Sequence, residues 1–183
     1  TSSIFPIVLS LVKQGLLKKV LVCIESAEKL SNIHNLEIYR VKNLEEAILF
    51  AKSKNKENFL YEKKIFEYKS LVINNETFYY EIKYKNDFSD VIGQDMAKYA
   101  AMISAAGNHN VIFEGSPGCG KSMISKRLQY IMPPMDLEEI LEKAKLQALD
   151  YKEIDFPPIR AFRSPHHSST KSSIFGGGSS NAK

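Results

Sequence analysis

Residues 110–122 read Asn-Val-Ile-Phe-Glu-Gly-Ser-Pro-Gly-Cys-Gly-Lys-Ser, and this stretch decides the fold. Its last eight residues match the pattern G-x-x-x-x-G-K-[S/T] at every fixed position. The apolar run before it predicts a strand over 110–114. The spacing after it predicts a helix through Ile131 that Pro133 and Pro134 end. A strand, a glycine-rich loop and a helix in this order are typical of a phosphate-binding loop in an α/β fold.

The fixed positions of such a loop each have a physical role. Glycines permit positive φ and let backbone amides crowd round an anion, and the start of the next helix adds its unpaired amides and its dipole. Lys121 would reach the β- and γ-phosphates, and Ser122 would offer its hydroxyl to Mg²⁺. The predicted nucleotide-binding residues are therefore Gly115, Ser116, Pro117, Gly118, Cys119, Gly120, Lys121 and Ser122.

Hydrolysis requires further groups, above all a carboxylate that holds the metal at the end of a second apolar strand. After Ser122 the only stretch rich in apolar residues is 137–149, and its spacing is helical, with Asp136 as its N-cap. From residue 176 onwards the chain reads Gly-Gly-Gly-Ser-Ser-Asn-Ala-Lys. We therefore expect this chain to bind a nucleotide without containing a catalytic residue.

The first part of the chain alternates helix and strand patterns. A helix from Ile4 that Gly15 ends, strands over 20–24 and 37–41, and a helix capped by Asn43 predict an α/β layer. A sheet this small leaves an open edge, so we expect a further segment upstream. Apolar runs at 71–73 and 77–82, which Asn-Asn-Glu separates, predict a β-hairpin.

Composition excludes several classes of protein. The 183 residues carry a net charge of +4, with 44% hydrophobic and 25% charged residues, which is ordinary for a folded domain. Residues 1–90 hold 14 basic and 12 acidic side chains and residues 91–183 hold 11 and 9, so neither half forms a strongly basic nucleic-acid surface. Two cysteines and no apolar run longer than nine residues favour a cytoplasmic protein that does not enter a membrane.

Three segments resemble a known family. Residues 87–94, Asp-Phe-Ser-Asp-Val-Ile-Gly-Gln, resemble the segment that opens AAA+ ATPase modules, where Ile92 and Gly93 would lie near the adenine. Residues 105–115 resemble the magnesium-chelatase-like branch. Residues 160–170, Arg-Ala-Phe-Arg-Ser-Pro-His-His-Ser-Ser-Thr, with the later triple glycine, resemble the ComM/YifB type within it.

The resemblance implies an incomplete P-loop NTPase (AAA+) core over 87–183. It also implies a preceding piece of a Lon-protease-like, ribosomal-protein-like α/β domain over 1–58 and a linker over 59–86. It further implies ATP and Mg²⁺ as cofactors, a hexameric ring, and a DNA-remodelling motor linked to natural transformation. A chelatase-type remodeller of a protein partner and a nucleotide-binding module without hydrolysis are the alternatives. In the family, the Asp-Glu strand follows the triple glycine, so we expect the chain to be a fragment.

Some residues depart from the family pattern or have two interpretations. Cys119 stands where Thr is usual, Ser116 where Pro or Thr is usual, and Ala161 where Pro is usual. Oxidation of Cys119 could block nucleotide binding, or the cysteine could be an inert substitution. The remaining ambiguous residues are the His166-His167 pair (metal ligands or a structural contact), Arg160 and Arg163 (phosphate contacts or a solvated loop), and Tyr79, Tyr80 and Tyr84 (base stacking or strand packing).

Overall fold

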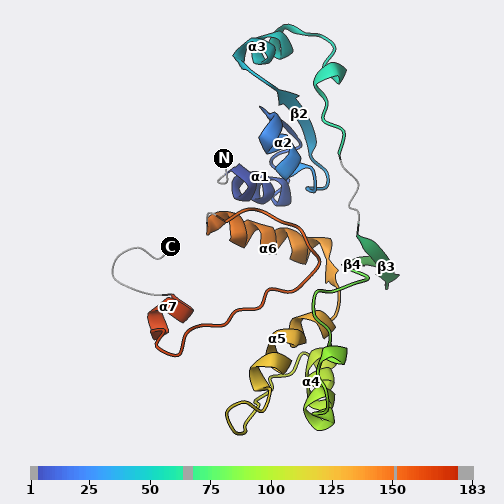
Figure 1. Ribbon diagram of the computed structural model, residues 1–183. Helices are drawn as coiled ribbons and strands as arrows, with labels where there is room; N and C mark the ends of the chain where they lie inside the picture. Colours follow the sequence, from blue (N-terminus) through green and yellow to red (C-terminus); the bar gives the residue numbers. More distant parts are fainter. Residues whose placement is uncertain (1–3, 64–67, 151, 177–183) are drawn as a thin grey trace. The chain divides into compact units, whose positions relative to one another are not determined.

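The computed structural model describes residues 4–63, 68–150 and 152–176, and helices and strands alternate from α1 to α3 (Figure 1). The chain forms two compact units. The first unit comprises Thr1–Lys85 and Pro133–Ile159, and the second comprises Asn86–Met132 and Arg160–Lys183. Each unit therefore joins segments that are far apart in the sequence.

The first unit contains most of the regular structure. Its elements are α1 (Ile4–Lys13), β1 (Lys19–Cys23), α2 (Ile24–Leu30), β2 (Glu37–Val41), α3 (Leu44–Lys52), the 3₁₀ turn η1 (Glu57–Phe59), β3 (Lys69–Ile73), β4 (Glu76–Tyr80), β5 (Met135–Asp136) and α6 (Leu137–Leu149). Strands β1 and β2 pair in parallel, with Lys19 opposite Glu37. Helix α2 connects them, as a parallel pair requires. These elements confirm the α/β pattern predicted for the first part.

Local signals set several boundaries in this unit. Gly15, at φ +72°, follows α1, and the Asn43 side chain accepts a hydrogen bond from the amide of Glu46 at the start of α3. Asp136 begins α6 with a reciprocal capping box, in which its carboxylate accepts from the amide of Glu139. The hairpin of β3 and β4 is also confirmed, and the short β5 adds a third antiparallel strand to it.

The core of the first unit draws on both of its segments. Helices α1 and α6 lie side by side, and buried residues of α6 join the cluster around Phe5, Leu9 and Ile38 (Figure 1). The half-buried Lys143 of α6 donates hydrogen bonds to the carbonyls of Pro157 at 2.7 Å and Ile159 at 3.2 Å. Apolar packing and these bonds hold the chain beyond α6 on the first unit.

The second unit is smaller and mostly helical. It contains the 3₁₀ turn η2 (Phe88–Asp90) and the helices α4 (Asp95–Gly107), α5 (Lys121–Ile131) and α7 (Lys171–Phe175). Helices α4 and α5 pack against each other (Figure 1). The buried residues of its apolar cluster are Val91, Ala101 and Ile124, with half-buried side chains around them. The predicted helix after residue 120 is confirmed, and it ends before the two prolines.

The predicted strand over 110–114 is wrong for this structure. These residues are all described, and they lie outside both sheets. Val111 and Phe113 are half-buried, whereas Ile112 is 92% exposed. The alternation of a strand is present, but a strand also needs a hydrogen-bonded neighbour, and neither sheet of the described chain provides one.

The domain limits at residues 58 and 86 were inferred from the resemblance to the family, and they stay a prediction. Packing divides the chain differently, because residues 133–159 join the first unit. Among the described residues, no helix combines the length and the apolar character that crossing a membrane requires.

Candidate nucleotide-binding site

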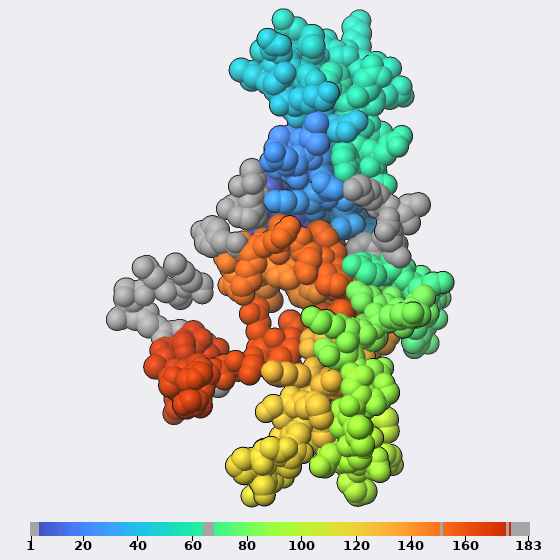
Figure 2. Space-filling model, in the orientation of Figure 1, coloured from blue at the N-terminus to red at the C-terminus, as the bar shows by residue number. Residues whose placement is uncertain are grey.

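The loop over 115–122 has the backbone that an anion-binding loop needs. Gly118 and Gly120 have φ of +81° and +90°, values that side-chain-bearing residues rarely adopt. Gly120 is also the N-cap of α5. Because glycine has no side chain, it cannot accept a hydrogen bond from the first amides of that helix. The segment around residue 115 lies at the molecular surface in Figure 2, and residues 115–118 are exposed.

Lys121 turns its side chain back into this loop. Its ammonium donates hydrogen bonds to the carbonyls of Gly115 and Ser116, both at 2.7 Å, and lies 3.5 Å from the sulfur of Cys119. The positive charge is therefore held by the loop itself at the start of α5. An anion there would meet the ammonium and the helix amides together.

Ser122 is the second residue of α5, and it is exposed. Its hydroxyl can serve as one oxygen ligand of Mg²⁺. Among the described residues, no group of three His, Cys, Asp or Glu side chains could hold a metal ion. A single serine hydroxyl suits a magnesium ion that takes its other ligands from phosphates and water, as Mg²⁺ commonly does.

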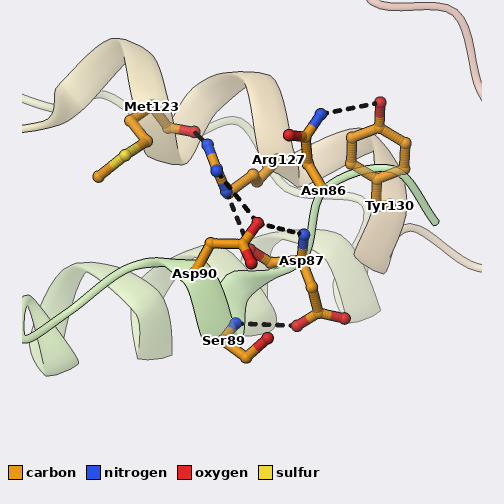
Figure 3. A network of polar contacts seen from close by, with 7 residues as sticks. All are labelled: Asn86, Asp87, Ser89, Asp90, Met123, Arg127 and Tyr130. Atoms are coloured by element: carbon orange, nitrogen blue, oxygen red, sulfur yellow. Dashed lines mark hydrogen bonds and ion pairs between the residues drawn. The ribbon is translucent and has the colours of Figure 1, made fainter. Parts of the chain in front are cut away.

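A network of polar contacts joins the segment 86–90 to α5 (Figure 3). The Arg127 guanidinium donates to the carbonyl of Asp87 at 2.9 Å, to the carboxylate of Asp90 at 3.1 Å and to the carbonyl of Met123 at 3.4 Å. The backbone amide of Asp87 and the Arg127 guanidinium both donate to the Asp90 carboxylate and hold its pKa below the ordinary value. Asn86 donates to the Tyr130 hydroxyl at 3.5 Å.

The predicted adenine-side residues follow this network directly. Val91 is buried in one cluster with Ile124 of α5, whereas the next residue, Ile92, is 94% exposed. Gly93 and Gln94 both have positive φ, +67° and +57°. Ile92 and Gly93 thus lie in the same unit as the loop over 115–122, directly after Val91, which packs in one cluster with Ile124 of α5.

A second contact fixes the chain as it enters the loop. The Ser104 hydroxyl donates to the carbonyl of His109 at 2.6 Å, and the His109 amide donates to the carbonyl of Ser104 at 2.9 Å. The His109 ring lies against Gly107, where an added Cβ would come within 2.3 Å of the ring nitrogen Nε2. A side chain at 107 would therefore have to displace the exposed His109 ring. The sequence reasoning passed over both this turn and Arg127.

The remaining candidate residues lie in other settings. His166 and His167 lie in a turn with ring centroids 4.0 Å apart. Arg163 is exposed in the segment before them, and Arg160 is half-buried. Tyr79 and Tyr80 lie half-buried in β4, within the first unit.

Comparisons with known proteins identify the same family as the sequence motifs do. The family model described as magnesium chelatase, subunit ChlI, matches residues 87–183. The competence protein ComM of Haemophilus influenzae is 44% identical over 94 residues, which cover 50% of this chain and 18% of that protein. The protein YifB of Salmonella typhimurium is 44% identical over 98 residues, 50% of this chain and 19% of the relative. An archaeal Lon protease of Archaeoglobus fulgidus is 45% identical over 51 residues, 28% of this chain and 8% of the protease. The chain thus aligns with less than a fifth of the length of each of these relatives.

Proposed function

Because the chain belongs to the magnesium chelatase subunit ChlI family of AAA+ proteins, we propose that it is the ATP-binding part of a ComM/YifB-like ATPase. The site is the loop over 115–122 at the start of α5. Ile92 and Gly93 form the adenine side, and Lys121 with the amides of α5 receives the phosphates.

The conformation of Lys121 is the observation that supports this proposal most. The ammonium is bonded to two carbonyls of its own loop at 2.7 Å and to the Cys119 sulfur at 3.5 Å, and it can exchange the neutral carbonyls for a charged phosphate oxygen. Hydrogen bonds between charged groups are shorter and about twice as strong as neutral ones. ATP binding would therefore draw the ammonium from the loop carbonyls to the phosphates.

Magnesium would arrive with the nucleotide. The exposed Ser122 hydroxyl is the residue of this loop that would hold it, and the ion would neutralise charge on the phosphates. The carboxylate that hydrolysis requires is not among the residues assigned to this site. We therefore propose that this chain contributes nucleotide binding, and that turnover belongs to the longer protein.

We also propose an assembly and a substrate by analogy with the family. A ring of six subunits, ATP-dependent movement of branched DNA and a link to natural transformation fit the similarity to the competence protein ComM. The segment from Arg160 to Gly176 adds one observation, because it contains Arg160, Arg163 and Lys171 and no acidic side chain. A local basic segment can bind phosphates even though the chain as a whole is only weakly basic. We place this activity in the cytoplasm.

The direct test of nucleotide binding is Lys121→Ala. We expect Mg²⁺-ATP to bind the 183-residue chain and to lose most of its affinity in the variant, measured by calorimetry. Lys126→Ala is the matched control, because it removes one exposed positive charge from the same helix. An affinity that Lys121→Ala leaves unchanged would refute the assignment of the site.

The second test separates the DNA motor from a remodeller of a protein partner. A full-length protein that contains this chain should hydrolyse ATP faster when branched DNA is added. An ATPase rate that branched DNA leaves unchanged would favour the chelatase-type alternative. A full-length protein that binds ATP without any turnover would favour a nucleotide-binding module.

A further inference from the structure

The network around Arg127 has a second consequence, which rests on the proposed ATP site. Arg127 lies six residues after Lys121 on the same helix, so one rigid element carries both the phosphate side of the site and this arginine. The arginine reaches from α5 to Asp87 and Asp90, 40 and 37 residues away in the sequence (Figure 3). Arg127 therefore fixes the position of η2 relative to α5, the helix that follows the loop over 115–122.

The contacts of Arg127 are built for positioning. The Arg127 side chain is 16% exposed, and its guanidinium uses three donors on three acceptors, two of them backbone carbonyls. Asp90 completes the arrangement, because the carboxylate oxygen that accepts from Arg127 also accepts from the amide of Asp87 at 2.9 Å. The planar fork of arginine suits such a set of fixed acceptors, and a lysine could make only part of it.

A second cation fixes the same segment from the other helix. Lys98 of α4 donates from its ammonium to the carbonyl of Val91 at 3.1 Å and pairs with Asp95 at 3.1 Å. The buried Val91 side chain packs in one cluster with Ile124. The backbone at Val91 is thus held by α4 and α5 together, and it carries the exposed Ile92 as the next residue.

We propose that Arg127 is a positioning residue for the base of the bound nucleotide. It holds the turn at Val91–Gly93 beside α5, so that the exposed Ile92 offers an apolar contact to the purine while the loop binds the phosphates. Arg127 touches neither the base nor the phosphates. Its loss should weaken the binding of the base and leave the binding of the phosphates unchanged.

Comparing two ligands tests this directly. Mg²⁺-ATP and Mg²⁺-tripolyphosphate share the phosphate chain, and only ATP has a base. We expect Arg127→Met in the 183-residue chain to weaken ATP by about tenfold and tripolyphosphate by less than about twofold, measured by calorimetry. Arg127→Lys should restore part of the ATP affinity, because it keeps the charge and loses the fork.

Two further variants serve as control and as independent check. Lys126→Met removes a neighbouring exposed charge and should change neither affinity. Asp90→Asn removes the charged acceptor from the other end of the contact and should weaken ATP selectively, as Arg127→Met does. Asp90→Asn also decides the question if the Arg127 variants fail to fold.

The results with ATP and tripolyphosphate distinguish a positioning role of Arg127 from a merely structural one. Equal losses for ATP and tripolyphosphate in the Arg127 and Asp90 variants would show a merely structural role and overturn the inference. Unchanged ATP affinity in both variants would overturn it as well. If the wild-type chain bound neither ligand, the proposed ATP site would fail first, and this inference with it.

Discussion

The two units of this chain are stabilised in different ways. The first unit buries large apolar side chains from α1, α2, β2 and α6 in one continuous cluster. In the second unit, the buried apolar cluster consists of Val91, Ala101 and Ile124, and the Arg127 network with the Lys98 contacts holds the segment beside it. The unit with the larger core has no residue of the proposed ATP site.

In this contrast, the larger apolar core lies in one unit and the proposed ATP site lies in the other. Large exposed apolar side chains of the second unit include Ile92, Met96, Tyr99, Met102, Ile103 and Ile112. A loop that must admit phosphates cannot also be packed tightly, because its amides have to remain available to the ligand. The second unit therefore relies on directional polar contacts, which fix geometry while burying little surface.

Phe5→Ala should have the largest effect on stability. Phe5 is 0% exposed and packs edge-on against Phe156 with ring centroids 5.8 Å apart. Removing a buried aromatic ring costs about 3–5 kcal/mol, since the cavity left behind closes only in part. Hydrogen exchange of α1 and α6 should accelerate strongly, while ATP binding by the second unit persists.

The matched control is Ile7→Ala on the same helix, because Ile7 is 59% exposed. This change should alter the free energy of unfolding by less than about 0.5 kcal/mol. Loss of ATP binding in Phe5→Ala would break the comparison, because the second unit would then depend on the apolar core of the first.

A pair of glycine substitutions sharpens the comparison. Gly120 in the second unit and Gly15 in the first have φ of +90° and +72°, and an added Cβ at either position meets no atom closer than 3.8 Å. The cost of alanine is therefore backbone strain, about 1–2 kcal/mol at each site. We expect both variants to be destabilised alike, as thermal unfolding would show.

Only Gly120→Ala should also weaken ATP binding, because Gly120 is the N-cap of α5 and sets the direction of the loop. Calorimetry with Mg²⁺-ATP on both variants checks this. Equal ATP affinity in the two variants would mean that the loop adapts to a side chain at this position. The left-handed backbone at Gly120 would then not be needed for binding.

Sequence reasoning recovered the elements whose signals are local. Asn43 and Asp136 each begin a helix by accepting a hydrogen bond from an amide three residues later, and the sequence shows both ends of that contact. The loop over 115–122 was predictable in the same way, since its pattern lies within eight residues. The loop conformation follows the pattern, and the bound nucleotide stays a prediction.

The larger failures involve partners that are distant in the sequence, whereas the missed turn between Ser104 and His109 is local. The run over 110–114 has the composition of a strand, but composition does not supply a neighbouring strand. The contacts of Arg127 escaped prediction, because nothing near it in the sequence shows that its acceptors lie 37 and 40 residues earlier. The packing of residues 133–159 with the first unit escaped prediction for the same reason.

The smallest expected effect is the loss of folding stability at low pH. Glu142 accepts from the Lys13 ammonium at 2.7 Å, which lowers the pKa of Glu142, and Asp90 in the second unit has a lowered pKa as well. A carboxylate whose pKa is lower in the folded chain stabilises it above the unfolded pKa, about 4, and this contribution is lost as the pH falls through the folded value. Water screens the pair in the first unit, so we expect less than about 1 kcal/mol from Glu142.

Hydrogen exchange between about pH 6 and about pH 3 can measure the two contributions separately. Once intrinsic exchange rates are corrected for pH, Glu142→Gln should flatten the acid loss of protection in α1 and α6, and Asp90→Asn should flatten it in α5. The Asp90 variant is the more informative, because the polar network carries more of the fixed geometry where the apolar cluster is small. If α5 lost protection in acid equally with and without the Asp90 carboxylate, the ion pair would not stabilise the second unit. The geometry beside the loop would then depend on the buried cluster of Val91, Ala101 and Ile124.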